Sequence, residues 1–387
     1  MKNDDLHKKK KESKQSPGLG LIKQLIVLAL VPAMIVGGFM AILLFREFDA
    51  KKQAEQIKSI ADYMVTANRV VHQLQRECGS SSGYIASNGS NMKDTMEKQR
   101  LLTDMYYTVM EGDIKSLDMA KLGYKFARRV NASSKKLWRL PSIREKITSL
   151  TIGNDESNEL YTEIIDDIIG TFQEASVIIK GSELSFPFTA CVNLIMATEM
   201  ASSERAILTG FVAKGKPVTQ AEVDAWMLVS KGQDALLGAF KYQITGEILK
   251  EFRNKMSESN IKAVMDIRKQ ISKNLANGNF GLKPEFVFAA VTGRIDDLKR
   301  VEDAQLQEIL KEATALSSEK MISVIIYSGL TGGSAIAMFI LCFFIAQSLT
   351  KPITMLSKAA KSVAEGELDH NIEIKSRGEI GELADSF

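Results

Sequence analysis

Two short segments, 127 residues apart, hold the residues whose types and spacing could carry chemistry. The first reads ECGSSSGYIA from Glu77, and the second reads ERAILTGFVA from Glu204. Glutamate, glycine, an aromatic residue, a β-branched residue and alanine match in register. Two unrelated packed helices can share a match of this length, but two related helical bundles would also leave this trace. The pattern therefore raises the possibility of an internal repeat.

Arginine is the residue type in this sequence that best suits the binding of a small anion. Its guanidinium presents a flat fork of donors that can meet a planar oxyanion with two hydrogen bonds, and it stays charged when buried. Arg205, inside the second segment, and Arg294, further along the chain, are the main candidates. Spacing alone favours ordinary surface or interhelix salt bridges for both.

The elements that must position these residues are predicted to be helices. Between the membrane runs described below, apolar residues recur at steps of three and four, the stripe of helices packing in a bundle. The clearest positions are Ile57, Ile60, Tyr63, Met64, Ala67, Val70, Val71 and Leu74, followed later by Val291, Ile295, Leu298, Val301, Leu306, Ile309, Leu310 and Ala313. Turn residues break the pattern at 87–90, 153–157, 214–217 and 277–281. We expect an all-helical region.

Two uncharged apolar runs, Leu25–Phe45 and Met321–Thr350, bracket this region. Each is long enough to cross a bilayer core of about 30 Å, which takes roughly 20 helical residues. Lysine-rich short flanks on both runs predict that both termini are cytoplasmic and that 46–320 lies outside, as in a receptor of the cell (plasma) membrane. A cleaved signal peptide is the alternative for the first run, but the run is too long and lacks a cleavage site. The first and last outer helices are expected to continue into the membrane helices.

The composition excludes several other classes of protein. The net charge of +3 comes largely from amino-terminal lysines, and there is no basic patch with interleaved aromatics, so nucleic acid is not an expected partner. Three cysteines cannot form a disulfide framework; Cys78 and Cys191 could pair outside the membrane or remain two buried thiols. No metal-ligand spacing, phosphate loop or catalytic constellation occurs. We expect neither an enzyme nor a cofactor.

The residues around Glu77 resemble a known sensory family. Leu74–Tyr84 resembles the opening signature of the nitrate- and nitrite-sensing (NIT) domain, the segment at Glu204 resembles its second arginine-bearing helix, and Ala289–Asp296 is similar to a late helix of that family. The resemblance covers roughly 60–315. It implies two stacked four-helix bundles with arginines converging on a small anion, nitrate or nitrite, between them. The ligand contacts that it implies are Arg205, Arg294, Arg76, Cys78 and Gly79, with Glu77 and Glu204 orienting donors or balancing charge.

One departure from the family pattern bears on the ligand. Cys78 stands where the family places its first arginine, and Arg76 lies about 200° away around the helix, so it cannot simply replace the lost side chain. The first helix is expected to contribute less positive charge. This weakens nitrate as the ligand, and it leaves open another small ligand, weaker binding, or a thiol role for Cys78.

The residues after the second apolar run resemble a HAMP linker. Pro352, heptad steps at Ile353, Leu356, Ala360 and Val363, the glycine Gly366 and a second start at Glu379 carry this resemblance over 348–387. It implies a parallel homodimer. The output module is expected to follow in a longer natural protein.

The predicted organisation is all-α, with paired extracytoplasmic four-helix bundles. Its parts are a basic tail 1–24, membrane helix 25–45, sensor 46–320, membrane helix 321–347 and a HAMP linker 348–387. We expect a dimeric transmembrane receptor for a small extracellular anion, with chemotaxis as the output through cytoplasmic signalling proteins. The sensing half of a histidine kinase or nucleotide cyclase with a different small-molecule ligand is the alternative, and a structural membrane protein is a third.

Overall fold

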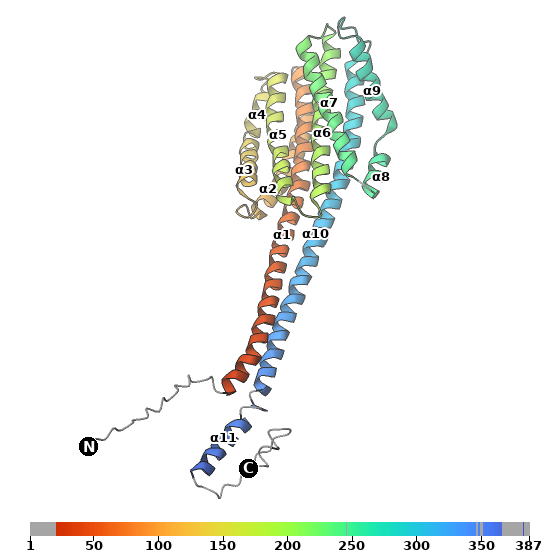
Figure 1. Cartoon of the computed structure of the whole chain (residues 1–387). Helices are drawn as coiled ribbons and strands as arrows, with labels where there is room; N and C mark the ends of the chain where they lie inside the picture. The colour runs from red at the N-terminus through yellow and green to blue at the C-terminus, as the bar shows by residue number, and fades with distance from the viewer. Residues whose placement is uncertain (1–20, 245, 346, 349–350, 366–381, 383–387) are drawn as a thin grey trace, which may run out of the picture. The chain divides into compact units, whose positions relative to one another are not determined.

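The computed structural model describes residues 21–244, 246–345, 347–348, 351–365 and 382. Within these residues the chain is helical and holds no strand, which confirms the all-α prediction. The helices are α1 (Leu21–Ala86), α2 (Lys93–Ser116), α3 (Tyr124–Leu137), α4 (Leu140–Thr148), α5 (Asn154–Ile179), α6 (Ser185–Lys214), α7 (Gln220–Gln243), α8 (Gly246–Lys255), α9 (Glu258–Lys273), α10 (Pro284–Ile345) and α11 (Lys351–Ala364) (Figure 1). The predicted breaks at 87–90 and 277–281 fall between helices, and the break at 214–217 begins at the last residue of α6, whereas 153–157 overlaps the first turn of α5.

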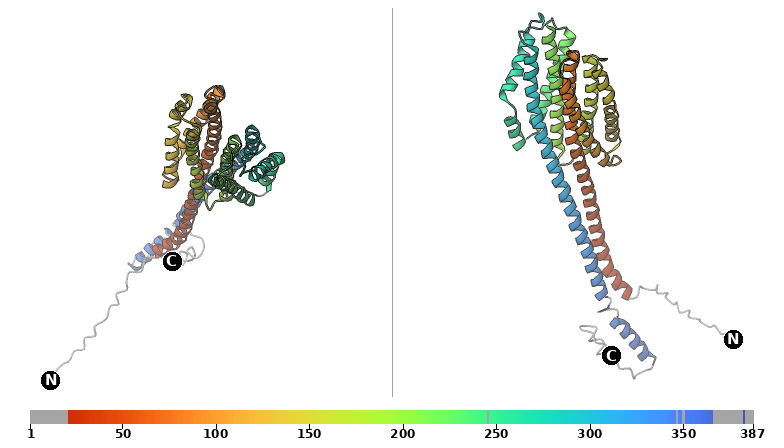
Figure 2. Two further views of the ribbon diagram at one scale, coloured as in Figure 1. Left: turned by 90° about the horizontal axis from the view of Figure 1, so that it is seen from above. Right: turned by 180° about the vertical axis from the view of Figure 1, so that it is seen from behind.

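The chain divides into two compact units, one of residues 1–51 with 320–387 and one of residues 52–319. In the first unit, the beginning of α1 and the end of α10 run side by side in both views (Figures 1 and 2). Both helices are long and apolar enough to cross a membrane, and their apolar windows are unburied. Such unburied apolar surface suits a lipid environment. The two predicted membrane helices are thus continuous parts of α1 and α10.

The unit of residues 52–319 is built around two hydrophobic cores. The outer part of α1 packs with α2, α3, α4 and α5 around the first core. Helices α6, α7, α8, α9 and the first part of α10 surround the second core. Figure 2 shows these two groups of helices as separate bundles when viewed along their axes. Each bundle has four helical columns. In the first bundle α3 and α4 together make up one column, and in the second bundle α8 and α9 do the same.

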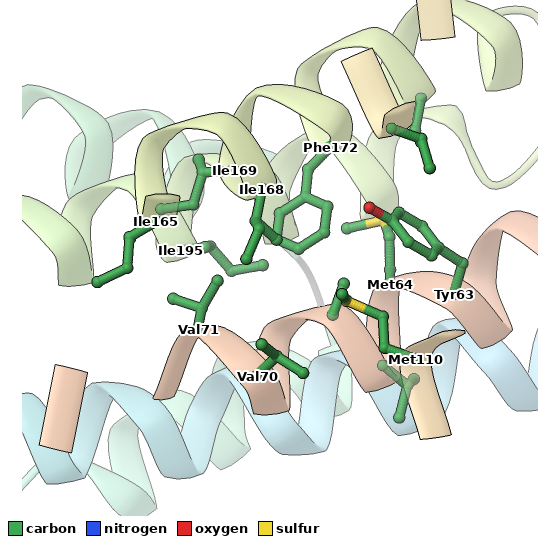
Figure 3. Packing of buried hydrophobic residues seen from close by; sticks show 14 of the residues in the cluster. Tyr63, Met64, Val70, Val71, Met110, Ile165, Ile168, Ile169, Phe172 and Ile195 are labelled. Atoms are coloured by element: carbon green, nitrogen blue, oxygen red, sulfur yellow. The ribbon is translucent and has the colours of Figure 1, made fainter. Parts of the chain in front are cut away.

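The first core shows how the sequence pattern becomes packing. Tyr63 and Met64 of α1 meet Phe172 of α5 (Figure 3), and the Tyr63 ring lies edge-on to Phe172 with centroids 6.5 Å apart. The Tyr63 hydroxyl is buried but bonds the Thr171 hydroxyl at 2.9 Å. Ile195 of α6 also enters this core. Since α6 contributes to both cores, the two bundles are packed against each other within one unit.

The helix bounds repeat along the chain. Helix α2 begins at Lys93 and α7 at Gln220, a difference of 127 residues (220 − 93), and both have 24 residues. The same offset separates Glu77 from Glu204 (204 − 77). The short sequence match therefore extends to the length and position of whole helices, as expected for two related bundles.

Two loops of the second bundle meet at Gly278, where we expect a large effect of a small substitution. Gly278 has φ +72°, and a Cβ there would lie 2.2 Å from the backbone carbon of Lys216. Gly278→Ala should lower the free energy of unfolding by about 1–3 kcal/mol, since it adds strain and a backbone clash. Gly238→Ala is the matched control, because a Cβ inside α7 would meet nothing within 4 Å. Gly238→Ala should raise the free energy of unfolding by about 0.5–1 kcal/mol. If thermal unfolding gave the same Tm for the two variants, this account would be contradicted.

Helix α11 covers the predicted first helix of the HAMP linker. It carries Ile353, Leu356, Ala360 and Val363 on one continuous helix. The predicted connector from Gly366 and the second helix from Glu379 lie outside the described residues, as does most of the basic tail. The predicted domain bounds remain predictions.

Candidate functional site

Each bundle contains a buried glutamate clamped by an arginine from the same bundle. In the first, Arg144 Nε lies 2.7 Å from Glu77 Oε1 and Nη2 lies 2.9 Å from Oε2. In the second, Arg268 Nε lies 2.7 Å from Glu204 Oε1 and Nη2 lies 2.7 Å from Oε2. Both glutamates are fully buried. These bidentate pairs give Glu77 and Glu204 partners within their own bundles.

The surroundings of the two pairs also correspond. Tyr161 donates a 2.7 Å hydrogen bond to Glu77, and the Trp226 indole donates one of 3.0 Å to Glu204. An aspartate at the surface completes each cluster: Asp104 lies 2.7 Å from Arg144, and Asp234 lies 3.2 Å from Arg268. The paired arginines were not predicted, because they follow their glutamates by more than sixty residues with no local motif.

A hollow of about 340 Å³ opens where the two bundles meet. Helix α1 supplies Arg76, α6 supplies Arg205 and α10 supplies Lys299. The remaining lining residues are Gln75, Gly79, Ser80, Met92, Thr95, Gln99, Phe288, Thr292, Ile295 and Asp296. Three cations therefore face one carboxylate, so the hollow carries an excess of positive charge.

Arg205 is held in place by neutral partners. Its guanidinium carbon lies 4.7 Å from the centroid of the Phe288 ring, and Nη1 donates to the Thr292 hydroxyl at 3.1 Å. Burial lowers the pKa of Arg205, an effect that nearby acidic groups partly offset. Because neither partner carries charge, the flat face and free donors of this guanidinium are suited to a planar anion.

Lys299 is the second buried cation of the hollow and is only 9% exposed. Burial lowers its pKa to about 8, and the charges of Arg205 and Arg76 add to this effect. Such mutual repulsion is relieved when an anion binds among the cations. Lysines are usually solvated, so nothing in the sequence pattern distinguished this one from the others.

The hollow contains some of the predicted ligand residues and not others. Arg205, Arg76 and Gly79 line it. Cys78 lies elsewhere, packed against the first core with its thiol 3.2 Å from Asn158 Oδ1. Arg294 also lies elsewhere: it is buried near the charges of Arg268 and Glu204, and its Nε has no hydrogen-bond partner among the described residues.

The cysteines of the described part of the chain are free thiols, so Cys78 and Cys191 are not paired in this structure. Burial is the main cause that raises the pKa of Cys78 to about 12, and the carboxylates of Glu199 and Glu77 add to it. The reactive form of cysteine is the thiolate. A redox role for Cys78 therefore has no support from its surroundings.

Anion binding in this hollow should weaken as the pH rises. Glu199, which bonds the hollow residue Gln75, has a pKa raised to about 7, mainly by burial. Above that pH its charge opposes an anion, and above about 8 Lys299 loses the charge that favours one. The affinity of the hollow for a small anion, measured from about pH 6 to 9, should fall in two steps. Glu199→Gln should remove the lower step and Lys299→Arg the upper one; a flat profile would contradict this assignment.

Comparison with known proteins bears on the family and the fold of the chain. A family described as nitrate and nitrite sensing (NIT) matches residues 69–310, and the HAMP domain matches 344–387. An 82-residue stretch, 21% of the chain, is 38% identical to the methyl-accepting chemotaxis protein McpB of Bacillus subtilis (strain 168) and spans only 11% of that protein. The solved structure of the NasR transcription antiterminator is similar in fold, with a TM-score of 0.64 and 18% identity over 89% of this chain and 97% of that one.

Proposed function

Since the chain belongs to the nitrate and nitrite sensing family and carries a HAMP domain, we propose that it is a transmembrane receptor for a small planar oxyanion, nitrate or nitrite. The ligand occupies the hollow formed by Arg76, Arg205 and Lys299. The observation that carries this proposal is the gathering of three cations from α1, α6 and α10 around one space, with a single carboxylate among them. Planar oxyanions offer only acceptors, which these donors match.

The site suggests how binding becomes a signal. An anion that attracts cations on α1, α6 and α10 draws the two bundles together at the hollow. Helices α1 and α10 also carry the apolar segments of the other unit. A small shift of one of these helices against the other, relayed to the HAMP linker, needs a coupling of only about 1–3 kcal/mol.

The finer parts of the proposal rest on sequence. The lysine-rich flanks support cytoplasmic termini and an extracytoplasmic sensor. The HAMP match supports a homodimer, and the stretch shared with a chemotaxis protein supports chemotaxis as the output, with no enzymatic activity in this chain. A kinase or cyclase output remains the alternative reading of the same sensor.

The direct test is ligand-dependent thermal unfolding of the full chain in lipid nanodiscs. Nitrate or nitrite at 100 times its dissociation constant should stabilise the folded state by about 2.7 kcal/mol, a shift of several degrees in Tm. Chloride is the control, because it lacks a planar set of acceptors. Equal shifts with chloride would indicate unspecific screening, and the absence of a shift with nitrate and nitrite would overturn the proposal.

A further inference from the structure

A second and larger hollow lies beside the first, between the facing sides of α1 and α10. Its volume is about 520 Å³. Helix α1 contributes Arg69, His72, Gln73 and Arg76, spaced so that they share one helix face. Helix α10 contributes Asp296, Lys299, Arg300, Asp303 and Gln307 in the same kind of spacing, and Tyr106 of α2 completes the lining. Two polar helix faces thus enclose this space.

The cations on these faces are not neutralised across the gap. Among the described residues, Arg69 and Arg76 form no ion pair, although Asp296 and Asp303 line the same hollow. Arg300 pairs with Asp297 of its own helix. The space between the two helix faces stays open.

The inner wall of the hollow holds a lysine whose side chain is largely buried and whose ammonium group reaches the open space. Lys299 is 9% exposed, and no hydrogen bond or ion pair reaches its ammonium group within the described part of the chain. Beside it, His72 is fixed by Glu302, whose carboxylate lies 2.8 Å from the imidazole Nε2. The ammonium nitrogen of Lys299 is not one of the fully buried polar atoms without a partner, so it keeps contact with the open space of the hollow, where an anion can meet it. Its position in the wall shared by both hollows points to an anionic ligand.

We propose that this second hollow binds a dianion, either a small organic dicarboxylate or a divalent oxyanion. Four cationic side chains and two carboxylates line it, and since Arg300 is already paired with Asp297 the remaining excess is one positive charge. Its volume is within the range of about 300–1,000 Å³ usual for ligand pockets and exceeds what a small planar ion needs. Its lining has no aliphatic residue, and Tyr106 is its one tyrosine or phenylalanine, so polar and charged groups dominate the space. Arg69 and Arg300 at the rim and Lys299 at the wall suit a ligand with two separated charges.

The two hollows share Arg76, Asp296 and Lys299. A dianion in the second hollow therefore uses charges that also serve the first, so each ligand should lower the affinity of the other. This antagonism follows if the oxyanion site proposed above exists, whereas binding of the dianion itself does not depend on that site. The occupancy of the receptor by one anion would then depend on the concentration of the other.

The test uses titration calorimetry on the full chain in nanodiscs, with sulfate and succinate as separate probes and nitrate as a third. Sulfate, succinate or both should bind, and the arm that binds identifies the oxyanion or the dicarboxylate as the ligand class. Arg69→Gln, which alters only the second hollow, should weaken that binding at least tenfold and leave nitrate affinity unchanged. Arg205→Gln should weaken nitrate binding at least tenfold and leave the binding of sulfate and succinate unchanged. Arg128→Gln, an exposed arginine of α3, is the charge-matched control and should leave all three affinities unchanged.

The outcomes separate the two proposals. Saturable sulfate or succinate binding that depends on Arg69 supports the second site even if nitrate fails to bind. No binding of either probe, or binding that Arg69→Gln leaves intact, overturns it. A tenfold loss with Arg128→Gln also overturns it, since net charge rather than a site would then govern binding.

Discussion

Replacement of Arg205 by glutamine should lower nitrate affinity by about 10- to 100-fold. A charge-assisted hydrogen bond contributes about 1.5–3 kcal/mol, and 1.4 kcal/mol corresponds to a factor of ten in affinity. Arg205 is partly buried against Phe288 and meets no carboxylate directly, so its donors are available to a ligand. Isothermal titration of the full chain with nitrate measures the loss. The glutamine keeps much of the side-chain volume, so the fold should persist.

Arg294 provides the discriminating comparison. The family resemblance predicts that both arginines contact the anion, whereas the structure places Arg294 outside the hollow, near Arg268 and Glu204. Arg294→Gln should therefore change nitrate affinity by less than about twofold. If the Arg294 variant stays folded and loses as much affinity as the Arg205 variant, the hollow described here is not the binding arrangement. Circular dichroism of both variants checks that folding is retained.

The helices and their buried faces could be predicted from the sequence. Every α1 position named from its spacing, from Ile57 to Leu74, is buried in the first core, and Val291 to Ala313 of α10 are buried or packed against a core. This works because burial in a bundle follows the 3.6-residue period, which is a local property of the chain. The internal match at Glu77 and Glu204 raised the possibility of an internal repeat, and the helix bounds of the two bundles follow the same offset.

The composition of the site depends on helix rotation, which a short motif does not specify. Arg294 and Lys299 are five residues apart on α10, about 140° around the helix, and only Lys299 faces the hollow. On α1, Arg76 and Gly79 share a face, and Cys78 lies on another. The 200° separation of Arg76 and Cys78 was predicted, but which of the two faces meets the second bundle was not. That choice is made by packing between bundles, through contacts distant in sequence.

The partners of Glu77 and Glu204 were missed for the same reason. A buried carboxylate requires a cation, but the chain offers many arginines, and only the fold selects Arg144 and Arg268. Once the repeat is known, the offsets are informative: 127 residues between the glutamates (204 − 77) and 124 between the arginines (268 − 144). The spacing alone does not select these arginines, because Arg129 and Arg253 also lie 124 residues apart (253 − 129).

The largest effect on stability is expected at these pairs. Arg144→Met should lower the free energy of unfolding by about 3–5 kcal/mol, since it leaves the fully buried Glu77 carboxylate without its cation. Arg268→Met should do the same in the second bundle, where Glu204 loses its partner. Lys121→Met, which breaks an exposed pair with Asp118, is the control and should cost less than about 1 kcal/mol. Thermal unfolding of the full chain measures all three.

A double variant tests whether the loss of stability in Arg144→Met comes from the unpaired Glu77 carboxylate. Glu77→Gln combined with Arg144→Met removes both charges and should recover a substantial part of the stability, because an uncharged amide is far less costly to bury than a carboxylate. The Tyr161 hydroxyl, 2.7 Å from Glu77 Oε1, can still donate to the amide oxygen. If the double variant were no more stable than Arg144→Met alone, the cost would lie in the lost packing of the arginine. In that case the Glu–Arg clusters shared by the two bundles would stabilise the fold by filling space, and their charges would be incidental.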